Sequence, residues 1–239
     1  MAPKFRESEF IDFNSGLVKI APLQMQFRIR MAGEAHMSDL IRLFQCRVEV
    51  WQLGVAAQVV NYIEHGTPPS VWAHAAYSVT AILIDYFETI GAILNEDNSS
   101  SISAATPAAQ PVFSTNEAAN FETCFYDVYP DFTTSTGAKI APREFHERMR
   151  NGLFALGSTP RGLWMHNSRS VSLQDFDVIQ KNPADASTLR YYINPHSMVR
   201  TLINHFPTVI ARLNNPDTQY EPLRARLQMF LGDETSTSS

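Results

Sequence analysis

The sequence predicts a mainly α-helical fold: a helical bundle built on a long antiparallel helix hairpin, with a small β appendage. Apolar residues recur at three- and four-residue steps from Met37 to Leu94, which is the spacing of an amphipathic helix. Thr67-Pro68-Pro69-Ser70 interrupts this pattern once, so two long helices joined by a short turn should lie antiparallel. Strand-like segments are short and gather between Gly162 and Ile193.

Residues 1–36 alternate apolar and polar side chains around Pro22, and we expect them to form an N-terminal arm that packs on the body. The best strand candidate within the arm runs from Gln24 to Arg30. Residues 37–232 are expected to form one helical domain, because 239 residues with 44% apolar content can bury a substantial core.

The first long helix should begin at Met37 and end near His65-Gly66. Its expected apolar stripe consists of Met37, Leu40, Phe44, Val48, Trp51, Val55, Val59 and Tyr62. The second helix should follow Pro68-Pro69, with a stripe of Trp72, Ala76, Val79, Leu83, Tyr86, Ile90 and Leu94. We therefore expect Trp51, Trp72 and Tyr86 to be core residues and not a platform for stacked bases.

Residues 95–112 are polar and small, and they are expected to form a flexible loop. A third helix should carry Phe121 and Phe125 before Pro130, and a fourth should open after Pro142 with Phe145, Met149 and Leu153 on its apolar side. The β appendage, residues 161–193, should contain strands at 162–166, 176–180 and 189–193. Asn194-Pro195 should cap a fifth helix, Pro222 should open a sixth that ends at Gly232, and residues 233–239 should be disordered.

The composition points to a protein of a reducing cytoplasm. Only Cys46 and Cys124 are present, both in apolar helical patterns, so we expect buried thiols and no disulfide scaffold. No unbroken apolar run is longer than the four residues found at Ala81 to Ile84, which is too short to span a bilayer, and the N-terminal residues lack the apolar core of a signal peptide. We therefore expect neither an anchor nor a membrane partner.

The net charge of −5 is unevenly distributed. No Lys or Arg lies between Arg47 and Lys139, whereas residues 139–169 contain Lys139, Arg143, Arg148, Arg150, Arg161 and Arg169. Such asymmetry can steer an anionic ligand to one face, so Arg143, Arg148, Arg161 and His166 are candidate binding residues. Mutual neutralisation of the two segments across the fold is the simpler explanation.

The segment Arg150-Asn151-Gly152-Leu153-Phe154-Ala155 resembles the signature of HEPN-type helical proteins, whose ribonuclease members carry Arg, a polar residue, a few more residues and then His. Ala155 stands where the histidine would be. Three further segments are similar to this family: Asp85 to Gly91, Asn120 to Tyr129, and Ile193-Asn194-Pro195 followed by His205-Phe206. The resemblance covers residues 37 to 214 and implies a HEPN-like bundle, often a dimer through the fourth helix.

In active members the resemblance implies a metal-independent cut, in which the RNA 2′-hydroxyl attacks the adjacent phosphate. There, His moves protons and Arg stabilises the developing charge. Alanine cannot transfer a proton, and the missing general acid-base step supplies a factor of about 100 to 10,000. We therefore expect a catalytically degenerate protein, with no cofactor, that binds RNA or a protein partner, in the defence or toxin-antitoxin setting typical of the family.

Two alternatives remain open. His146 shares a helix face with Arg143 and Arg150, and His166 follows Arg161 at the signature's spacing, so Arg150 and Asn151 could act with either histidine as an endoribonuclease. Alternatively, the protein is a structural helical adaptor. Independently of these alternatives, we expect Arg150 to pair with Asp85 and Glu88 and to brace the fourth helix against the second, and we expect Gly152 to permit close approach of another backbone. No metal site is expected, since His65 and His74 lack further ligands at suitable spacing.

Overall fold

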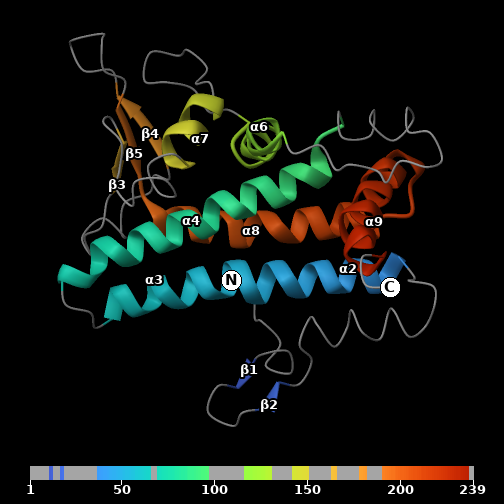
Figure 1. Cartoon of the computed structure of the whole chain (residues 1–239), viewed down its shortest axis with the longest axis horizontal. Coiled ribbons are helices and arrows are strands. Elements are labelled where there is room, and N and C mark those ends of the chain that lie inside the picture. The colour runs from blue at the N-terminus through green and yellow to red at the C-terminus, as the bar shows by residue number, and fades with distance from the viewer. Residues whose placement is uncertain are drawn as a thin grey trace.

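The computed structural model describes residues 11–12, 17–18, 37–65, 69–96, 116–130, 142–150, 163–165, 178–181 and 190–236 (Figure 1). Several sequence predictions lie outside these residues. They concern the strand candidate at 24–30, most of the loop at 95–112, the signature residues Asn151 to Ala155, and Arg161 and His166.

Helices dominate the described residues, which confirms the prediction of a mainly α protein. Their bounds are α2 (Met37–Cys46), a π-helical segment η2 (Arg47–Gly54), α3 (Val55–His65), α4 (Pro69–Leu94), α6 (Glu117–Val128), α7 (Pro142–Arg150), α8 (Pro195–Asn214), the 3-10 turn η4 (Thr218–Tyr220) and α9 (Glu221–Ser236). The predicted cap of the fifth helix is present, because the Asn194 side chain accepts a hydrogen bond from the backbone N–H of Ser197.

The described strands are short. β1 (Ile11–Asp12) pairs antiparallel with β2 (Leu17–Val18). β3 (Leu163–Met165), β4 (Val178–Lys181) and β5 (Arg190–Ile193) form a sheet of order β3-β5-β4, in which β3 is parallel and β4 antiparallel to β5. These three strands overlap the segments expected from sequence, and β5 leads through Asn194 directly into α8.

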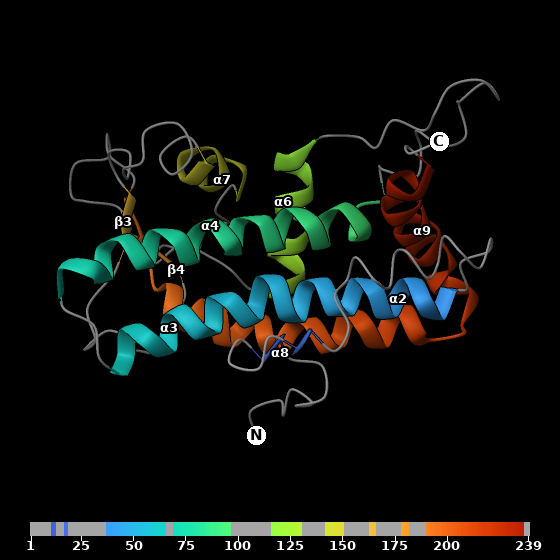
Figure 2. The same ribbon diagram turned by 60° about the horizontal axis from the view of Figure 1, so that its bottom comes forward.

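The continuous helix α2-η2-α3 and the helix α4 run side by side in opposite directions (Figures 1 and 2). Helix α8 packs along the same pair, and α6 crosses the outer side of α4. Helix α9 contacts α2 and α4 where α2 begins and α4 ends. As a result, the C-terminal helix closes one end of the bundle, while α7 contacts α6 and α4 towards the other.

Aromatic rings fill the space between these helices. Phe87 of α4 lies 5.0 Å from Phe121 and 5.7 Å from Phe125 of α6, measured between ring centroids. Phe44 of α2 meets Phe206 of α8 edge to face at 5.8 Å. All five side chains are at most 1% exposed, so α2, α4, α6 and α8 share one aromatic core.

The π-helical segment changes which face of the first helix is buried. Up to Val48, buried residues on this face are four positions apart: Leu40, Phe44 and Val48. The next buried residue, Leu53, comes five positions after Val48, and Ala56 and Val60 then follow at α-helical spacing. A π turn inserts one residue, which rotates the following side chains by about 100°. The predicted stripe is therefore wrong after Val48, and Trp51, Val55 and Tyr62 are 48%, 44% and 65% exposed.

A matched pair of substitutions tests this shift in phase. Leu53→Ala removes a fully buried side chain and should lower the free energy of unfolding by about 2 to 5 kcal/mol. Trp51→Ser removes a larger but exposed side chain and should change it by less than about 1 kcal/mol. Urea denaturation of both variants measures the two values. A regular α-helix would reverse their order.

Three smaller predictions need correction. Asn95, expected in a flexible loop, is 6% exposed and donates from Nδ2 to Asn120 Oδ1 at 3.0 Å. Helix α9 continues past Gly232 to Ser236, because one glycine in a helix costs only about 1 kcal/mol and does not by itself end it. Cys124 is buried as expected, but Cys46 is only half-buried.

The expectation that no segment could span a membrane rested on unbroken apolar runs and overlooked α4 as a whole. Residues Ala75–Leu94, at a mean hydropathy of 1.3, are long and apolar enough to cross a bilayer by length and composition alone. In the fold, 56% of this window is buried, as the position of α4 between α3, α6 and α8 requires. Burial inside the bundle accounts for its composition.

Candidate functional site

Helix α7 carries the first candidate site and is anchored by its apolar face. Pro142 starts the helix, where a missing backbone N–H costs nothing. Phe145 and Met149 are 1% and 0% exposed against α6 and α4, as the sequence predicted. The outer face carries the exposed Arg143, and Arg150 ends the helix with 41% of its side chain exposed.

His146 lies on the buried face of this helix. Its Nε2 atom is 2.6 Å from Glu88 Oε1 of α4, and its ring centroid is 4.8 Å from that of Phe121. Only 3% of the His146 side chain is exposed, and its Nδ1 atom has no hydrogen-bond partner among the described residues. Because a carboxylate can only accept, Nε2–H donates to Glu88. Both nitrogens are thus withheld from a substrate in solution.

The predicted brace between Arg150 and the pair Asp85 and Glu88 is wrong in its partners. Arg150 forms an ion pair with Glu117 of α6, and both side chains are about 40% exposed. Asp85 accepts a hydrogen bond of 2.5 Å from Gln52 Nε2 on η2, away from α7. Helix α7 meets α4 one turn before Arg150, so His146 takes the place beside Glu88 that the sequence assigned to the arginine.

The other predicted site residues are only partly described. Arg143 is exposed and Arg148 half-buried, whereas Asn151, Arg161, His166 and Ala155 lie outside the described residues. The structure therefore brings His146 and Glu88 together, and separately Arg150 and Glu117. Gly152 is likewise outside the described residues, but a close backbone approach of the kind predicted there occurs at Gly91, where a Cβ would meet the backbone of Asn120.

A second polar cluster joins α4, α6 and α8, and the sequence did not predict it. The Tyr86 hydroxyl lies 2.8 Å from His205 Nδ1, and His205 Nε2 lies 2.8 Å from Asp127 Oδ2. Nη1 of Arg212 donates to both Asp127 oxygens at 2.9 Å. Since the carboxylate can only accept, His205 donates from Nε2, and its Nδ1 is hydrogen-bonded to the Tyr86 hydroxyl. The result is a continuous series of hydrogen bonds from a fully buried hydroxyl to a half-exposed arginine.

The surroundings determine the protonation of the Tyr86 hydroxyl and of the Asp127 carboxyl. Burial and the charge of Asp127 raise the pKa of Tyr86 well above its usual value, so its hydroxyl remains a donor. Burial alone would raise the pKa of Asp127, but hydrogen bonds and positive charge from His205 and Arg212 outweigh it, so this pKa is lowered.

The shift at Asp127 predicts acid sensitivity. A carboxyl whose pKa is lower in the folded state stabilises the fold fully above the unfolded value, about 3.9 for aspartate, and loses that contribution as pH falls through the folded value. Asp127→Asn cannot make this contribution. The difference in unfolding free energy between wild type and Asp127→Asn should be constant near neutral pH and shrink below about pH 4. Denaturation series at several pH values measure it, and a difference that grew in acid would contradict the assignment.

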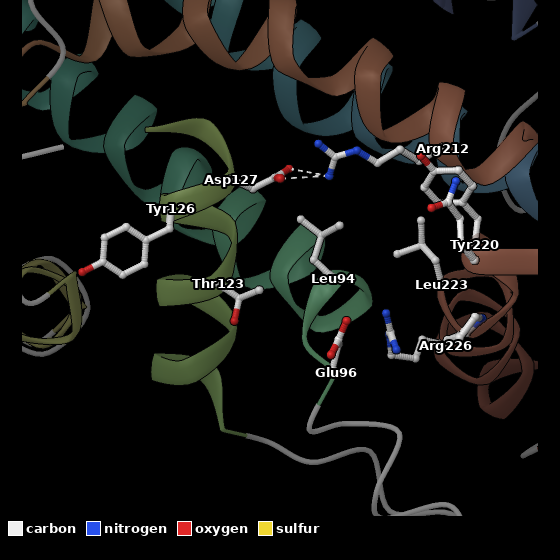
Figure 3. A pocket seen from close by; sticks show the side chains of 11 residues that line it. Leu94, Glu96, Thr123, Tyr126, Asp127, Arg212, Tyr220, Leu223 and Arg226 are labelled. Carbon is white, nitrogen blue, oxygen red and sulfur yellow. Dashed lines mark hydrogen bonds and ion pairs between the residues drawn. The ribbon is translucent and has the colours of Figure 1, made fainter. Parts of the chain in front are cut away.

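A cavity of about 640 Å³ opens beside this cluster, between the ends of α4 and α6 and the region from η4 into α9 (Figure 3). Asp127 and Arg212 form one side, and Figure 3 shows Arg226 pointing towards Glu96 at another. Arg226 is only 5% exposed, its Nε donates to the Ile93 carbonyl at 2.5 Å, and its Nη1 has no partner among the described residues. Burial lowers the pKa of Arg226, and the charge of Glu96 opposes that shift.

Two signals in the sequence could have pointed to this cluster. His205 and Arg212 are seven residues apart, which places them two turns apart on one face of α8. Asp127 lies in the segment that has no Lys or Arg, so a buried Asp127 needs cations from elsewhere in the chain. Neither signal predicts which side chains pair, because contacts between side chains of different helices depend on how the helices cross.

Within the described part of the chain, no three His, Cys, Asp or Glu side chains are grouped so that they could hold a metal ion. Comparison of the chain with protein-family models, curated proteins and solved structures finds no match.

Proposed function

We propose that this chain is a catalytically degenerate, HEPN-like protein of the cytoplasm that binds RNA through α7 and does not cut it. The observation that carries the proposal is the division of α7 into two faces. Its only histidine, His146, is buried and held by Glu88, while Arg143 and Arg150 are turned outwards. A general acid-base group must reach the proton that it transfers, whereas a phosphate-binding arginine only needs access to the backbone.

The ion pair between Arg150 and Glu117 is compatible with RNA binding. Both side chains are about 40% exposed, and exposed pairs contribute only about 0 to 1 kcal/mol. A phosphate can therefore replace the Glu117 carboxylate, and the arginine fork suits its oxygens. In the same proposal, the strands β3 to β5 form the small β appendage of the HEPN-like bundle, and α7 also provides the contact of a homodimer.

Equilibrium binding to a single-stranded RNA at several salt concentrations tests this function. Arg143→Ala with Arg150→Ala should lower the affinity at low salt by about tenfold or more, and should reduce the slope of log affinity against log salt by about 0.7 for each phosphate that the variant no longer neutralises. The matched control is Arg42→Ala with Arg200→Ala, which removes the same charge from exposed positions on α2 and α8. The control should bind like wild type.

Two outcomes would reject RNA binding through α7. If both double variants lose affinity equally, the attraction is one of net charge. If wild type binds no RNA even at low salt, the adaptor role with a protein partner is favoured instead.

A further inference from the structure

The cavity beside Asp127 has the properties of a ligand site that is separate from α7. Its volume of about 640 Å³ lies within the usual range of small-molecule pockets, about 300 to 1,000 Å³. Its lining combines the apolar side chains of Leu94, Pro222 and Leu223 with a larger number of side chains that carry polar groups, two of them arginines. Figure 3 shows these side chains reaching the cavity from α4, α6, α8 and α9.

Arg226 is the group that points to a ligand. A guanidinium carries five N–H donors, and leaving a buried donor unsatisfied is costly. In Arg226 the backbone carbonyl of Ile93 takes the Nε hydrogen, while buried Nη1 has no partner among the described residues. Only 5% of Arg226 is exposed, yet the residue lines the cavity. Nη1 itself is closed to solvent, so a small turn of the guanidinium group would let an oxyanion in the cavity accept a hydrogen bond from it.

Arg212 adds a second cation on the neighbouring side. Its Nη1 is committed to Asp127, whereas no other nitrogen of Arg212 has a hydrogen bond among the described residues. The Asp127 carboxylate is in turn held by His205, so the arginine is fixed in place by the chain that begins at buried Tyr86. Arg212 therefore contributes a fixed cation to the cavity wall, while Arg226 offers the planar fork that suits an oxyanion.

We propose that this cavity binds a small molecule carrying one phosphate or carboxylate group, with the oxyanion at Arg226 and its apolar part against Leu94, Leu223 and Tyr220, while Arg212 adds positive charge to the cavity wall. Glu96 lies opposite Arg226, so its carboxylate competes with the ligand for the positive charge of the Arg226 guanidinium. The site is independent of RNA binding at α7, since neither α7 nor Arg150 lines it.

Titration calorimetry with phenyl phosphate, benzoate and inorganic phosphate tests the proposal. Phenyl phosphate and benzoate carry the same ring and differ in the anion, so their comparison assigns the phosphate or the carboxylate class. Inorganic phosphate lacks the apolar part and is expected to bind more weakly than phenyl phosphate. The failure of all three probes to bind wild type at millimolar concentration would overturn the proposal.

Two variants with opposite expected signs locate the site. Glu96→Gln removes the competing carboxylate from an exposed position and should tighten binding about threefold to tenfold, whereas Glu122→Gln on α6, outside the cavity, should not. Arg226→Lys keeps the charge but loses the planar fork and should weaken binding about tenfold or more, with Arg200→Lys as its control. If Arg226→Lys fails to fold, the comparison of Glu96→Gln with Glu122→Gln still tests whether the ligand binds in this cavity. Equal effects of Glu96→Gln and Glu122→Gln would overturn the assignment.

Discussion

Gly91→Ala is expected to destabilise the protein by about 3 kcal/mol or more, although alanine is the better helix former by about 1 kcal/mol. A Cβ at position 91 would overlap the carbonyl carbon and oxygen of Asn120 and would lie 2.9 Å from its Cα atom. Backbone atoms cannot rotate away as a flexible side chain can, so α4 and α6 would have to separate. The measurement is the free energy of unfolding from urea denaturation of wild type and variant.

Separation of these helices would have further effects that can be observed. It would open the packing of Phe87 against Phe121 and weaken the hydrogen bond between Asn95 and Asn120. Gly54→Ala is the comparison, because its Cβ would meet one carbonyl oxygen, that of Glu49, at 2.7 Å, and it should cost less. A Gly91→Ala protein as stable as wild type would show that α4 and α6 do not approach each other as described.

Glu88→Ala is expected to lower the free energy of unfolding by about 2 to 4 kcal/mol. The substitution removes the carboxylate that holds His146 and leaves an imidazole with 3% exposure and no partner for either nitrogen among the described residues. For Arg150→Ala we expect a small effect, below about 1 kcal/mol, because the Arg150 pair with Glu117 is exposed on both sides. Thermal or urea denaturation of the two variants compares them directly.

Replacement of both partners together separates the pair from its surroundings. Glu88→Leu with His146→Leu replaces both partners by apolar side chains and should recover much of the loss seen with Glu88→Ala. Glu147→Ala, at an exposed position next to His146, is the control and should be nearly neutral. If Arg150→Ala proved the more damaging variant, the arginine and not the histidine would join α7 to the bundle.

The sequence predicted those features that depend on local pattern. The spacing of apolar residues placed α4 and α8, the Asn194-Pro195 pair placed the start of α8, and Phe145 and Met149 were correctly assigned to the buried face of α7. Each of these follows from residues within a few turns of one another, where helical periodicity and capping act.

The predictions that were wrong concern a local irregularity or contacts between distant segments. Nothing in residues 47–54 marks a π turn, so the exposure of Trp51 could not be read from the stripe. Whether Glu88 meets His146 or Arg150 depends on where α7 crosses α4, and a difference of one turn decides it. The cluster of Tyr86, His205 and Asp127 joins residues up to 119 positions apart, which no local pattern specifies.

Above all, we infer that Arg150 has lost its proton-transferring neighbour, so the protein binds RNA without cutting it. Incubation of single-stranded RNA with the protein in the presence of a chelator, followed by electrophoresis of the RNA, tests this most directly. We expect intact RNA from wild type, from His146→Gln and from His166→Ala alike. RNA cleavage by wild type that disappears in a folded His146→Gln or His166→Ala variant and in Arg150→Ala would contradict the inference.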